Sequence, residues 1–149
     1  MVLLNPFGGA GAAIRNWRLV EPLFQEAHID YELTETQHAG HAGEIVRDQI
    51  SPGQFDAIIT VSGDGLIHEI VNGLLRRSDW NRRVEVEGKG KVRFKDILTL
   101  GAIPGGSGNG FIKSLLWRGN EEYDITVAAF RVLKQRAVEV DLTELSMEY

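Results

Sequence analysis

The segment that constrains the fold most is a mostly hydrophobic run over residues 57–61 that follows Asp56 and ends abruptly at Ser62-Gly63-Asp64-Gly65. The run is rich in β-branched residues, which is typical of a buried strand. Directly after the glycines, apolar residues recur with the spacing of one buried helix face: Leu66, Ile67, Ile70, Val71, Leu74 and Leu75. The segment therefore predicts a strand that passes through a tight turn into a helix.

The turn between this strand and this helix has the features of an anion site. A helix N-terminus carries N–H groups without helical acceptors and the positive end of the helix dipole, and both suit a phosphate. Gly63 and Gly65 let the backbone come close to a ligand. An anion site needs no carboxylate of its own, so Asp64 between the glycines indicates chemistry, such as accepting a proton or organising a metal ion.

Strand-like and helix-like segments alternate along the rest of the chain. Strands are predicted at residues 2–4, 29–34, 98–103 and 138–142, and helices at 14–24, 42–49, 111–117 and 125–133. Pro22 is expected to kink or restart the first of these helices. This alternation favours an α/β fold of three layers, α/β/α, in which helices cover both faces of a mostly parallel sheet.

Glycine-rich loops follow three of the predicted strands, at residues 5–11, 62–65 and 104–110. Ligands of parallel sheets bind beyond the carboxyl ends of the strands, so these loops are expected to share one site. Neither common nucleotide motif is complete. Ile14 takes the third glycine position of the dinucleotide fingerprint, and Ser107-Gly108 stands where a P-loop has Lys-Ser/Thr. The sequence therefore predicts a phosphate site of a different kind.

The composition limits the class of protein. With 149 residues, the chain is long enough for one well-buried domain and short for two. A net charge of −5 argues against general nucleic-acid binding, and the absence of Cys excludes disulfides, thiolate zinc sites and a cysteine nucleophile. No apolar run is long enough to cross a bilayer, so we expect a cytoplasmic protein.

Two local features leave alternatives open. Residues 76–96 hold eight of the sixteen basic residues, and Val84–Lys91 within them is interpreted as an inserted loop or hairpin. A solvated surface is the favoured interpretation of this insertion, and contact with anionic lipid headgroups is the alternative. His38 and His41 suggest a metal-binding pair, but without a third ligand an ordinary polar loop is favoured.

The three glycine loops, taken in order, resemble a known family. Asn5-Pro6-Phe7-Gly8-Gly9, Ser62-Gly63-Asp64-Gly65 and Pro104-Gly105-Gly106-Ser107-Gly108-Asn109 are similar to motifs of the catalytic domain shared by diacylglycerol kinases and sphingosine kinases. The block from Ser62 to Leu74, followed by Asp79-Trp80, resembles the sphingosine kinases more closely. The resemblance extends from Leu3 to about Leu145.

This resemblance implies a fold similar to the nucleotide-binding domain of phosphofructokinase and NAD kinase. Residues 1–149 would form the catalytic, nucleotide-binding domain, with the start of a β-rich second domain at about 138–149. It also implies ATP and Mg²⁺ as cofactors and Asp64 as the catalytic residue, with metal ligands not identified. The residues expected to contact the nucleotide are Asn5, Pro6, Phe7, Gly8, Gly9, Thr36, Ser62, Gly63, Gly65, Glu69, Ser107, Gly108 and Asn109. Phe7 departs from the basic or small residue that the family often has there.

The expected activity is ATP-dependent phosphorylation of the primary hydroxyl of sphingosine or a related sphingoid base. Three alternatives stay open: a diacylglycerol kinase, an NAD-kinase-like enzyme acting on a soluble nucleotide, and a non-catalytic nucleotide-binding or scaffold domain. The expected partner is the lipid substrate, with no nucleic acid. Peripheral contact with a membrane and homo-oligomerisation are left open.

Overall fold

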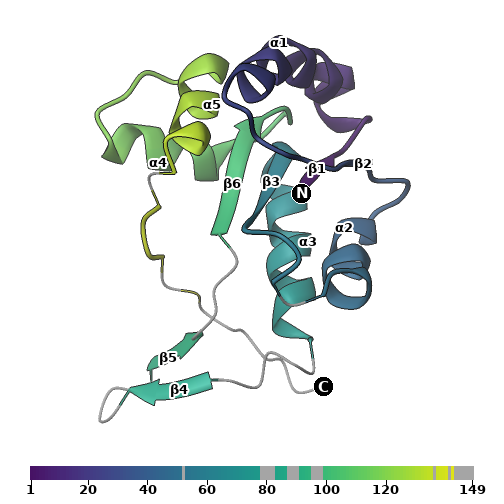
Figure 1. Cartoon of the computed structure of the whole chain (residues 1–149), viewed down its shortest axis with the longest axis vertical. Coiled ribbons are helices and arrows are strands. Elements are labelled where there is room, and N and C mark those ends of the chain that lie inside the picture. Colours follow the sequence, from purple (N-terminus) through teal and green to yellow (C-terminus); the bar gives the residue numbers. More distant parts are fainter. Residues whose placement is uncertain are drawn as a thin grey trace.

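A four-stranded parallel sheet forms the middle of the molecule in the computed structural model, which describes residues 1–51, 53–77, 83–86, 91–94, 99–135, 137–140 and 142 (Figure 1). Its strands are β1 (Val2–Leu4), β2 (Leu33–Glu35), β3 (Ala57–Ser62) and β6 (Thr99–Pro104), in the spatial order β2-β1-β3-β6. Each neighbouring pair is parallel, and β3 pairs with β6 along its whole length. The predicted parallel sheet is confirmed.

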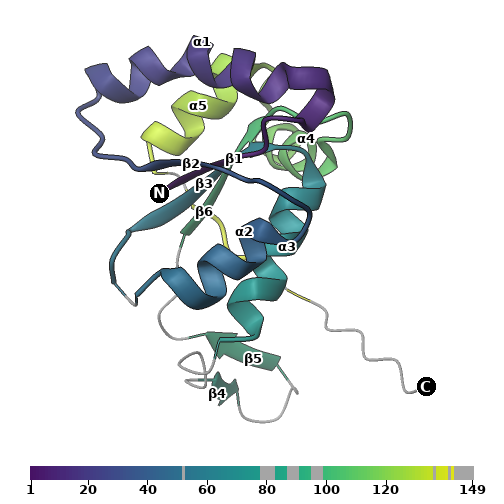
Figure 2. The same ribbon diagram turned by 90° about the vertical axis from the view of Figure 1, so that its right-hand side faces the viewer.

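Helices cover both faces of this sheet (Figure 2). Over one face lie α1 (Ala12–Glu26), which the short 3-10 helix η1 (Gly8–Gly11) precedes, and α5 (Ile125–Leu133). Over the other lie α3 (Asp64–Leu75) and α2 (His41–Glu44), which a π-helical turn, η2 (Ile45–Gln49), continues. The remaining helix, α4 (Gly110–Arg118), packs beside β6 and α5. The predicted three-layer arrangement is confirmed, and none of the described helices is long and apolar enough to cross a membrane.

The core is divided by the sheet into two parts. Val2 and Leu4 of β1 join the core beneath α1 and α5, whereas Leu3 between them joins the core against α2 and α3. Ile59 and Ile58 of β3 divide in the same way. Because both faces of the central strands are buried, apolar residues follow one another directly instead of alternating with polar ones.

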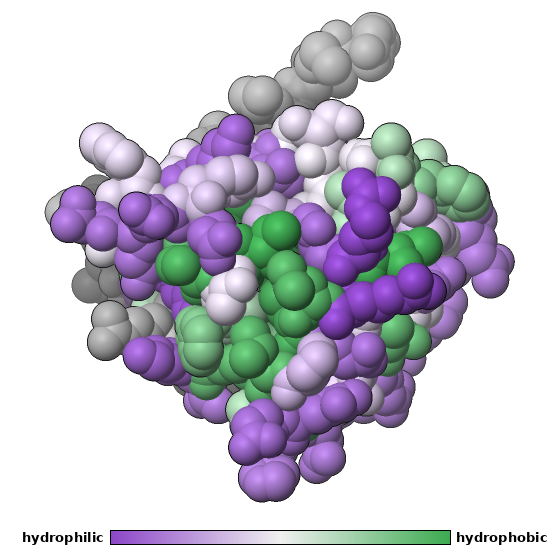
Figure 3. Space-filling model, turned by 90° about the horizontal axis from the view of Figure 1, so that it is seen from above, coloured by the Kyte–Doolittle hydropathy of each residue, from purple (hydrophilic) through white to green (hydrophobic). Residues whose placement is uncertain are grey.

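The outer helical layer leaves some apolar surface exposed. Leu19 of α1 and Phe130 of α5 are 59% and 45% exposed. From the side of the molecule on which these helices lie, hydrophobic side chains gather in the middle of the surface, with hydrophilic ones around them (Figure 3). α1 and α5 therefore shield the sheet while keeping apolar side chains of their own in contact with solvent.

The strand predicted at 29–34 is shorter and begins later, at Leu33. Tyr31 packs instead against α1, where its ring centroid lies 5.3 Å from that of Trp17. The Ile29 N–H donates to the Phe24 carbonyl at 3.0 Å, which extends the end of the helix rather than a strand. α1 itself continues through Pro22 instead of restarting there.

The last predicted strand is absent from its described residues. Residues 137–140 and 142 are in no strand, and Val138, Val140 and Leu142 are 45–52% exposed. Alternation of polar and apolar residues makes a strand only where a neighbouring strand supplies hydrogen bonds, and none of the described strands lies beside this segment. The other residues of the region assigned to a second domain, 141 and 143–149, lie outside the described residues.

Of the loop or hairpin expected for the insertion, the structure forms the hairpin. β4 (Arg83–Val86) pairs with β5 (Lys91–Phe94) in a separate antiparallel sheet. In and around the insertion, residues 78–82, 87–90 and 95–98 lie outside the described residues.

Close contact between α2 and α3 predicts a specific sensitivity at Gly73. A Cβ atom there would lie 2.6 Å from Val46 Cγ2 and 2.8 Å from Gly43 Cα, so the two helices would have to move apart. We expect Gly73→Ala to lower the free energy of unfolding by about 1–3 kcal/mol, as overpacking does elsewhere. The measurement is chemical denaturation monitored by circular dichroism.

The matched control lies in the same helix. A Cβ atom at Gly65 would meet nothing within 4 Å, so Gly65→Ala should not lower the stability. Equal stability of the Gly73→Ala variant and the unsubstituted chain would contradict the α2–α3 packing described above.

Candidate functional site

The three glycine loops meet at the carboxyl ends of three neighbouring strands, β1, β3 and β6. They enclose an open cleft of about 320 Å³. Its lining residues are Asn5, Gly8, Gly9, Ser62, Gly63, Asp64, Gly65, Leu66, Glu69, Gly106, Ser107 and Gly108. The three loops therefore line one cleft, as their positions in the sequence predicted.

Glycine is required here because the loops touch backbone to backbone. A Cβ atom on Gly9 would lie 2.7 Å from the Gly105 carbonyl oxygen, and one on Gly106 would lie 2.5 Å from the Gly63 nitrogen. Gly65 differs from these residues, because nothing lies within 4 Å of its Cβ position. The crowded glycines hold the loops together, whereas the missing side chain of Gly65 leaves open space in the cleft.

Asp64 joins two helices at the edge of this cleft. It is the first residue of α3, and its carboxylate accepts hydrogen bonds from the first two N–H groups of α4: Gly110 N–H to Oδ2 at 2.7 Å and Phe111 N–H to Oδ1 at 2.9 Å. Its own N–H donates to the Gly108 carbonyl at 3.3 Å. The carboxylate is thereby held in one orientation while staying exposed, and its remaining lone pairs can accept a proton or bind a cation.

Glu69 supplies a second carboxylate to the cleft, just over one helical turn further along α3. Its Oε2 atom is buried and has no hydrogen-bond partner among the described residues, a condition shared only with Trp17 Nε1 in the core. Buried polar atoms are normally paired. An unpaired carboxylate oxygen beside an open cleft is therefore available to a hydrogen-bond donor or a cation on a ligand.

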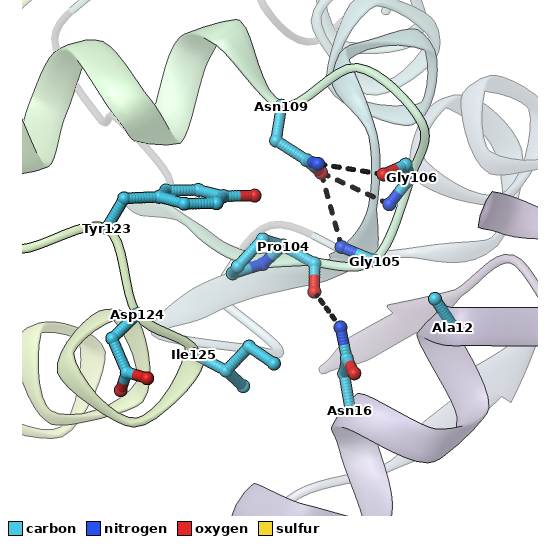
Figure 4. Close-up of a pocket in the computed structure, with 9 residues that line it drawn as sticks. All are labelled: Ala12, Asn16, Pro104, Gly105, Gly106, Asn109, Tyr123, Asp124 and Ile125. Atoms are coloured by element: carbon cyan, nitrogen blue, oxygen red, sulfur yellow. Dashed lines mark hydrogen bonds between the residues drawn. The ribbon is translucent and has the colours of Figure 1, made fainter.

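Asn109 shapes its loop from within. Its Oδ1 accepts from the N–H groups of Gly105 and Gly106 at 3.3 and 3.1 Å, and its Nδ2 donates to the Gly106 carbonyl at 2.8 Å (Figure 4). It does not line the cleft but faces a second cavity of about 230 Å³, on the other side of Gly105 and Gly106. The structure thus gives Asn109 a role in holding the loop rather than a position in the cleft.

The second cavity lies between α1 and the start of α5, and its walls are tied to the same loop. Asn16 donates to the Pro104 carbonyl at 2.7 Å, and Tyr123 extends its hydroxyl toward Asn109 (Figure 4). Burial raises the pKa of the Tyr123 hydroxyl above its usual value, and the nearby Asn109 side chain offsets only part of this shift. The phenol therefore stays neutral at physiological pH.

Three of the residues expected to contact a nucleotide also lie outside the cleft lining. Thr36 is buried, and its N–H donates to the Leu4 carbonyl at 2.8 Å. Pro6 and Phe7 do not line the cleft; the Phe7 side chain is 78% exposed, and its N–H donates to Asn5 Oδ1 at 3.0 Å. These contacts make Asn5 a turn-forming residue as well as a lining one.

Two lining residues were not among those expected. Gly106 belongs to the loop in which Ser107 and Gly108 were expected to contact the nucleotide. It lines the cleft because its backbone touches Gly63, a contact that requires β3 and β6 to be neighbours in the sheet. Leu66 was assigned to the core by its helical spacing, and it serves both the core and the cleft.

Comparison with known proteins decides the family. Residues 1–145 match the model of the diacylglycerol kinase catalytic domain, which is nearly the whole chain. The chain belongs to the diacylglycerol kinase catalytic domain family. This agrees with the order of the three glycine loops and with the parallel sheet that brings them together.

Several relatives of this kinase-family chain are sphingoid base kinases. It is 38% identical over 147 residues to sphingosine kinase 1 of Arabidopsis thaliana, covering 98% of this chain and 28% of that protein. It is 41% identical over 116 residues to sphingosine kinase 1 of Homo sapiens, covering 77% and 27%. With sphingoid long chain base kinase 4 of Schizosaccharomyces pombe, identity is 35% over 143 residues, covering 95% and 28%. The chain thus spans less than a third of the length of these relatives.

A solved structure supports the assignment of the fold. The crystal structure of a diacylglycerol kinase from Bacillus anthracis str. Sterne superimposes with a TM-score of 0.64 at 26% sequence identity, covering 91% of this chain and 39% of that one. The kinase-family fold is therefore shared at the level of both sequence and structure.

Because two N–H groups of α4 donate hydrogen bonds to the Asp64 carboxylate, replacing this carboxylate by an amide is expected to lower the stability of the fold. Asn can keep one of these bonds through its carbonyl oxygen, but its NH₂ group would face the other backbone N–H. We expect Asp64→Asn to lower the free energy of unfolding by about 0.5–1.5 kcal/mol, the net contribution of one hydrogen bond. Urea denaturation measures this change, with Asp30→Asn at an exposed position as the control. Identical denaturation midpoints for both variants would mean that Asp64 does not cap α4.

Proposed function

We propose that the protein containing this chain is an ATP-dependent kinase that phosphorylates the primary hydroxyl of a sphingoid base. The observation that carries this proposal is the position of Asp64: a fixed, exposed carboxylate at the edge of a glycine-lined cleft, beside the N-termini of α3 and α4. Membership of the kinase family supports the use of ATP. The sphingosine and sphingoid base kinases among its relatives support the substrate class.

The phosphates of ATP would lie in the cleft against the backbone of the three loops. Helix N-termini favour negative groups, and the open space at Gly65 admits a phosphate next to the first turn of α3. The unpaired Oε2 of Glu69 can only accept, so it would receive a donor of the nucleotide, a ribose hydroxyl or the exocyclic amino group, or bind a cation.

The residues of the cleft fit a bound Mg²⁺ ion. Asp64 and Glu69 bring two carboxylates to it, and no Lys or Arg is among its described lining residues. Carboxylate oxygens are the protein ligands that Mg²⁺ uses, together with phosphate oxygens. Bound there, Mg²⁺ would neutralise charge on the phosphates during transfer. Without such a cation, the two carboxylates would repel a polyphosphate.

Asp64 would act on the acceptor hydroxyl. Both of its oxygens are held by N–H groups of α4, which fixes the direction of the lone pairs that remain. Through one of these, the carboxylate would orient the hydroxyl toward the γ-phosphate and take its proton as the new oxygen–phosphorus bond forms, while the bond from the γ-phosphorus to the β-phosphate oxygen breaks and ADP leaves. General-base assistance of this kind contributes about 10²–10⁴-fold to the rate.

The lipid chain would be bound by residues of a second domain that begins at about 138–149. A long apolar chain needs a concave apolar pocket. The described cleft offers one large apolar side chain, Leu66, among glycines and polar residues. The relatives are also more than three times as long as their matched parts. Because sphingoid bases reside in lipid, we further propose peripheral contact with the cytoplasmic side of a membrane. We also propose that copies of the chain associate through the half-exposed apolar side chains of Val138, Val140 and Leu142.

The test is phosphorylation by the full-length protein carrying Asp64→Asn. We expect turnover of sphingosine to fall by at least about 100-fold while the affinity for MgATP changes much less, because the variant loses its proton acceptor but keeps the loops and the carboxylate of Glu69. The control is Asp124→Asn, since Asp124 Oδ1 caps α5 through the N–H groups of Thr126 and Val127 outside the cleft. Near-normal turnover of Asp64→Asn would remove this residue from the chemistry.

A panel of acceptors separates the substrate classes in the same assay. The family name and the Bacillus structure favour diacylglycerol as the second candidate. We expect phosphorylation of sphingosine or phytosphingosine in preference to diacylglycerol by the full-length protein, and none of these lipids by residues 1–149 alone. Preference for diacylglycerol would overturn the substrate assignment, and equal activity of the short chain would overturn the second-domain proposal.

A further inference from the structure

A cluster of potential metal ligands lies outside the cleft. Among the residues that the structure describes, His38, His41 and Glu44 form the only group of three or more His, Cys, Asp or Glu side chains close enough to hold one ion. One ligand atom from each lies within 4.8 Å of the others. The sequence offered His38 and His41 as a pair without a third ligand. The first turn of α2 supplies that ligand as Glu44.

His38 is arranged as a metal-binding imidazole usually is. Its Nδ1 lies 3.1 Å from the Ala39 carbonyl oxygen, so a proton on Nδ1 leaves the lone pair of Nε2 free. Metal-bound histidines commonly donate their other N–H to a carbonyl in this way. His38 Nε2 lies 3.6 Å from Glu44 Oε2. Two ligand atoms about 2.0–2.1 Å from a tetrahedral zinc ion lie about 3.4 Å apart, which is close to this separation.

Metal binding by His41 would break a hydrogen bond that its ring makes with the Gln37 N–H. Its ring centroid lies 4.8 Å from that of His38 with the planes 32° apart, and its Nδ1 accepts the Gln37 N–H at 3.1 Å. A neutral imidazole has one lone pair. A metal bound at Nδ1 would replace this N–H, and one bound at Nε2 would require the proton to move to Nδ1. Metal binding by His41 therefore releases the Gln37 N–H in either case.

We propose that His38, His41 and Glu44 bind one divalent transition-metal ion of the zinc type, with water in the remaining position. Two imidazoles and one carboxylate are a ligand set typical of Zn²⁺ sites, whereas Mg²⁺ and Ca²⁺ prefer oxygen ligands throughout. His38 and Glu44 are exposed, so an ion can enter directly and both side chains can turn toward it. An ion pair between His38 and Glu44 alone would give His41 no part and would not require a metal.

Titration of the 149-residue chain with Co²⁺ and Zn²⁺ tests the site. We expect one equivalent of Co²⁺ to produce visible ligand-field absorption, Zn²⁺ to displace it, and the amide resonance of Gln37 to shift on loading. His38→Ala and Glu44→Gln change exposed side chains and should each weaken Zn²⁺ binding, measured by calorimetry, at least about ten-fold.

The control is His28→Asn, because His28 is exposed, lies outside the cluster and has a φ of 53°, which Asn tolerates. Its affinity for Zn²⁺ should equal that of the unsubstituted chain. The proposal is overturned if no Zn²⁺ binds, if the His38→Ala/Glu44→Gln double variant binds as well as the unsubstituted chain, or if His28→Asn loses as much affinity as the ligand variants.

Discussion

The loops that follow β1, β3 and β6 touch one another backbone to backbone, and the position of the candidate site depends on this contact. β1, β3 and β6 are neighbours in one parallel sheet, so their carboxyl ends deliver three loops to the same edge. Gly9 and Gly105 meet there, as do Gly63 and Gly106, at distances that exclude a Cβ atom. This packing fixes where α3 and α4 begin, and with them the carboxylate of Asp64.

The described lining of this cleft carries negative charge only. It carries two carboxylates and, among its described lining residues, no basic side chain. In the proposed function, the attraction for a phosphate would therefore come from helix N-termini and backbone N–H groups, and full neutralisation would require a cation. Such a cleft would bind a metal–nucleotide complex better than a free polyphosphate, in keeping with the absence of a P-loop lysine from the glycine loop at 101–108.

Most of the fold could be predicted because it follows from local periodicity. The run at 57–61 and the helical spacing from Leu66 onward determine the central strand and helix, and the glycine loops mark where strands end. The strand expected at 29–34 begins only at Leu33 because Tyr31 packs on Trp17 of α1, a tertiary contact that periodicity does not reveal. The strand expected at 138–142 is absent from the described residues of that segment, because an alternating pattern does not show whether a neighbouring strand is there to pair with.

The candidate site was predictable in outline but not in its details. Loop order and spacing brought Asp64, Gly65 and Glu69 to one place, as the structure does. The internal bonds of Asn109 depend on the turn geometry of its own loop, which sequence letters do not specify. The sequence did not identify Glu44 as a neighbour of His38, because their distance depends on the conformation of the loop between β2 and α2.

The proposal that a nucleotide binds in the cleft between the three glycine loops can be tested directly by locating its binding site. Titration of the ¹⁵N-labelled chain with MgADP, followed by NMR, reports this residue by residue. We expect saturation at one equivalent, with shifts at the amides of Gly8, Gly65 and Gly108 in the cleft and little change at Asn16 and Ile125 in the second cavity. Shifts centred on Asn16 and Ile125, or no shifts at all, would contradict it.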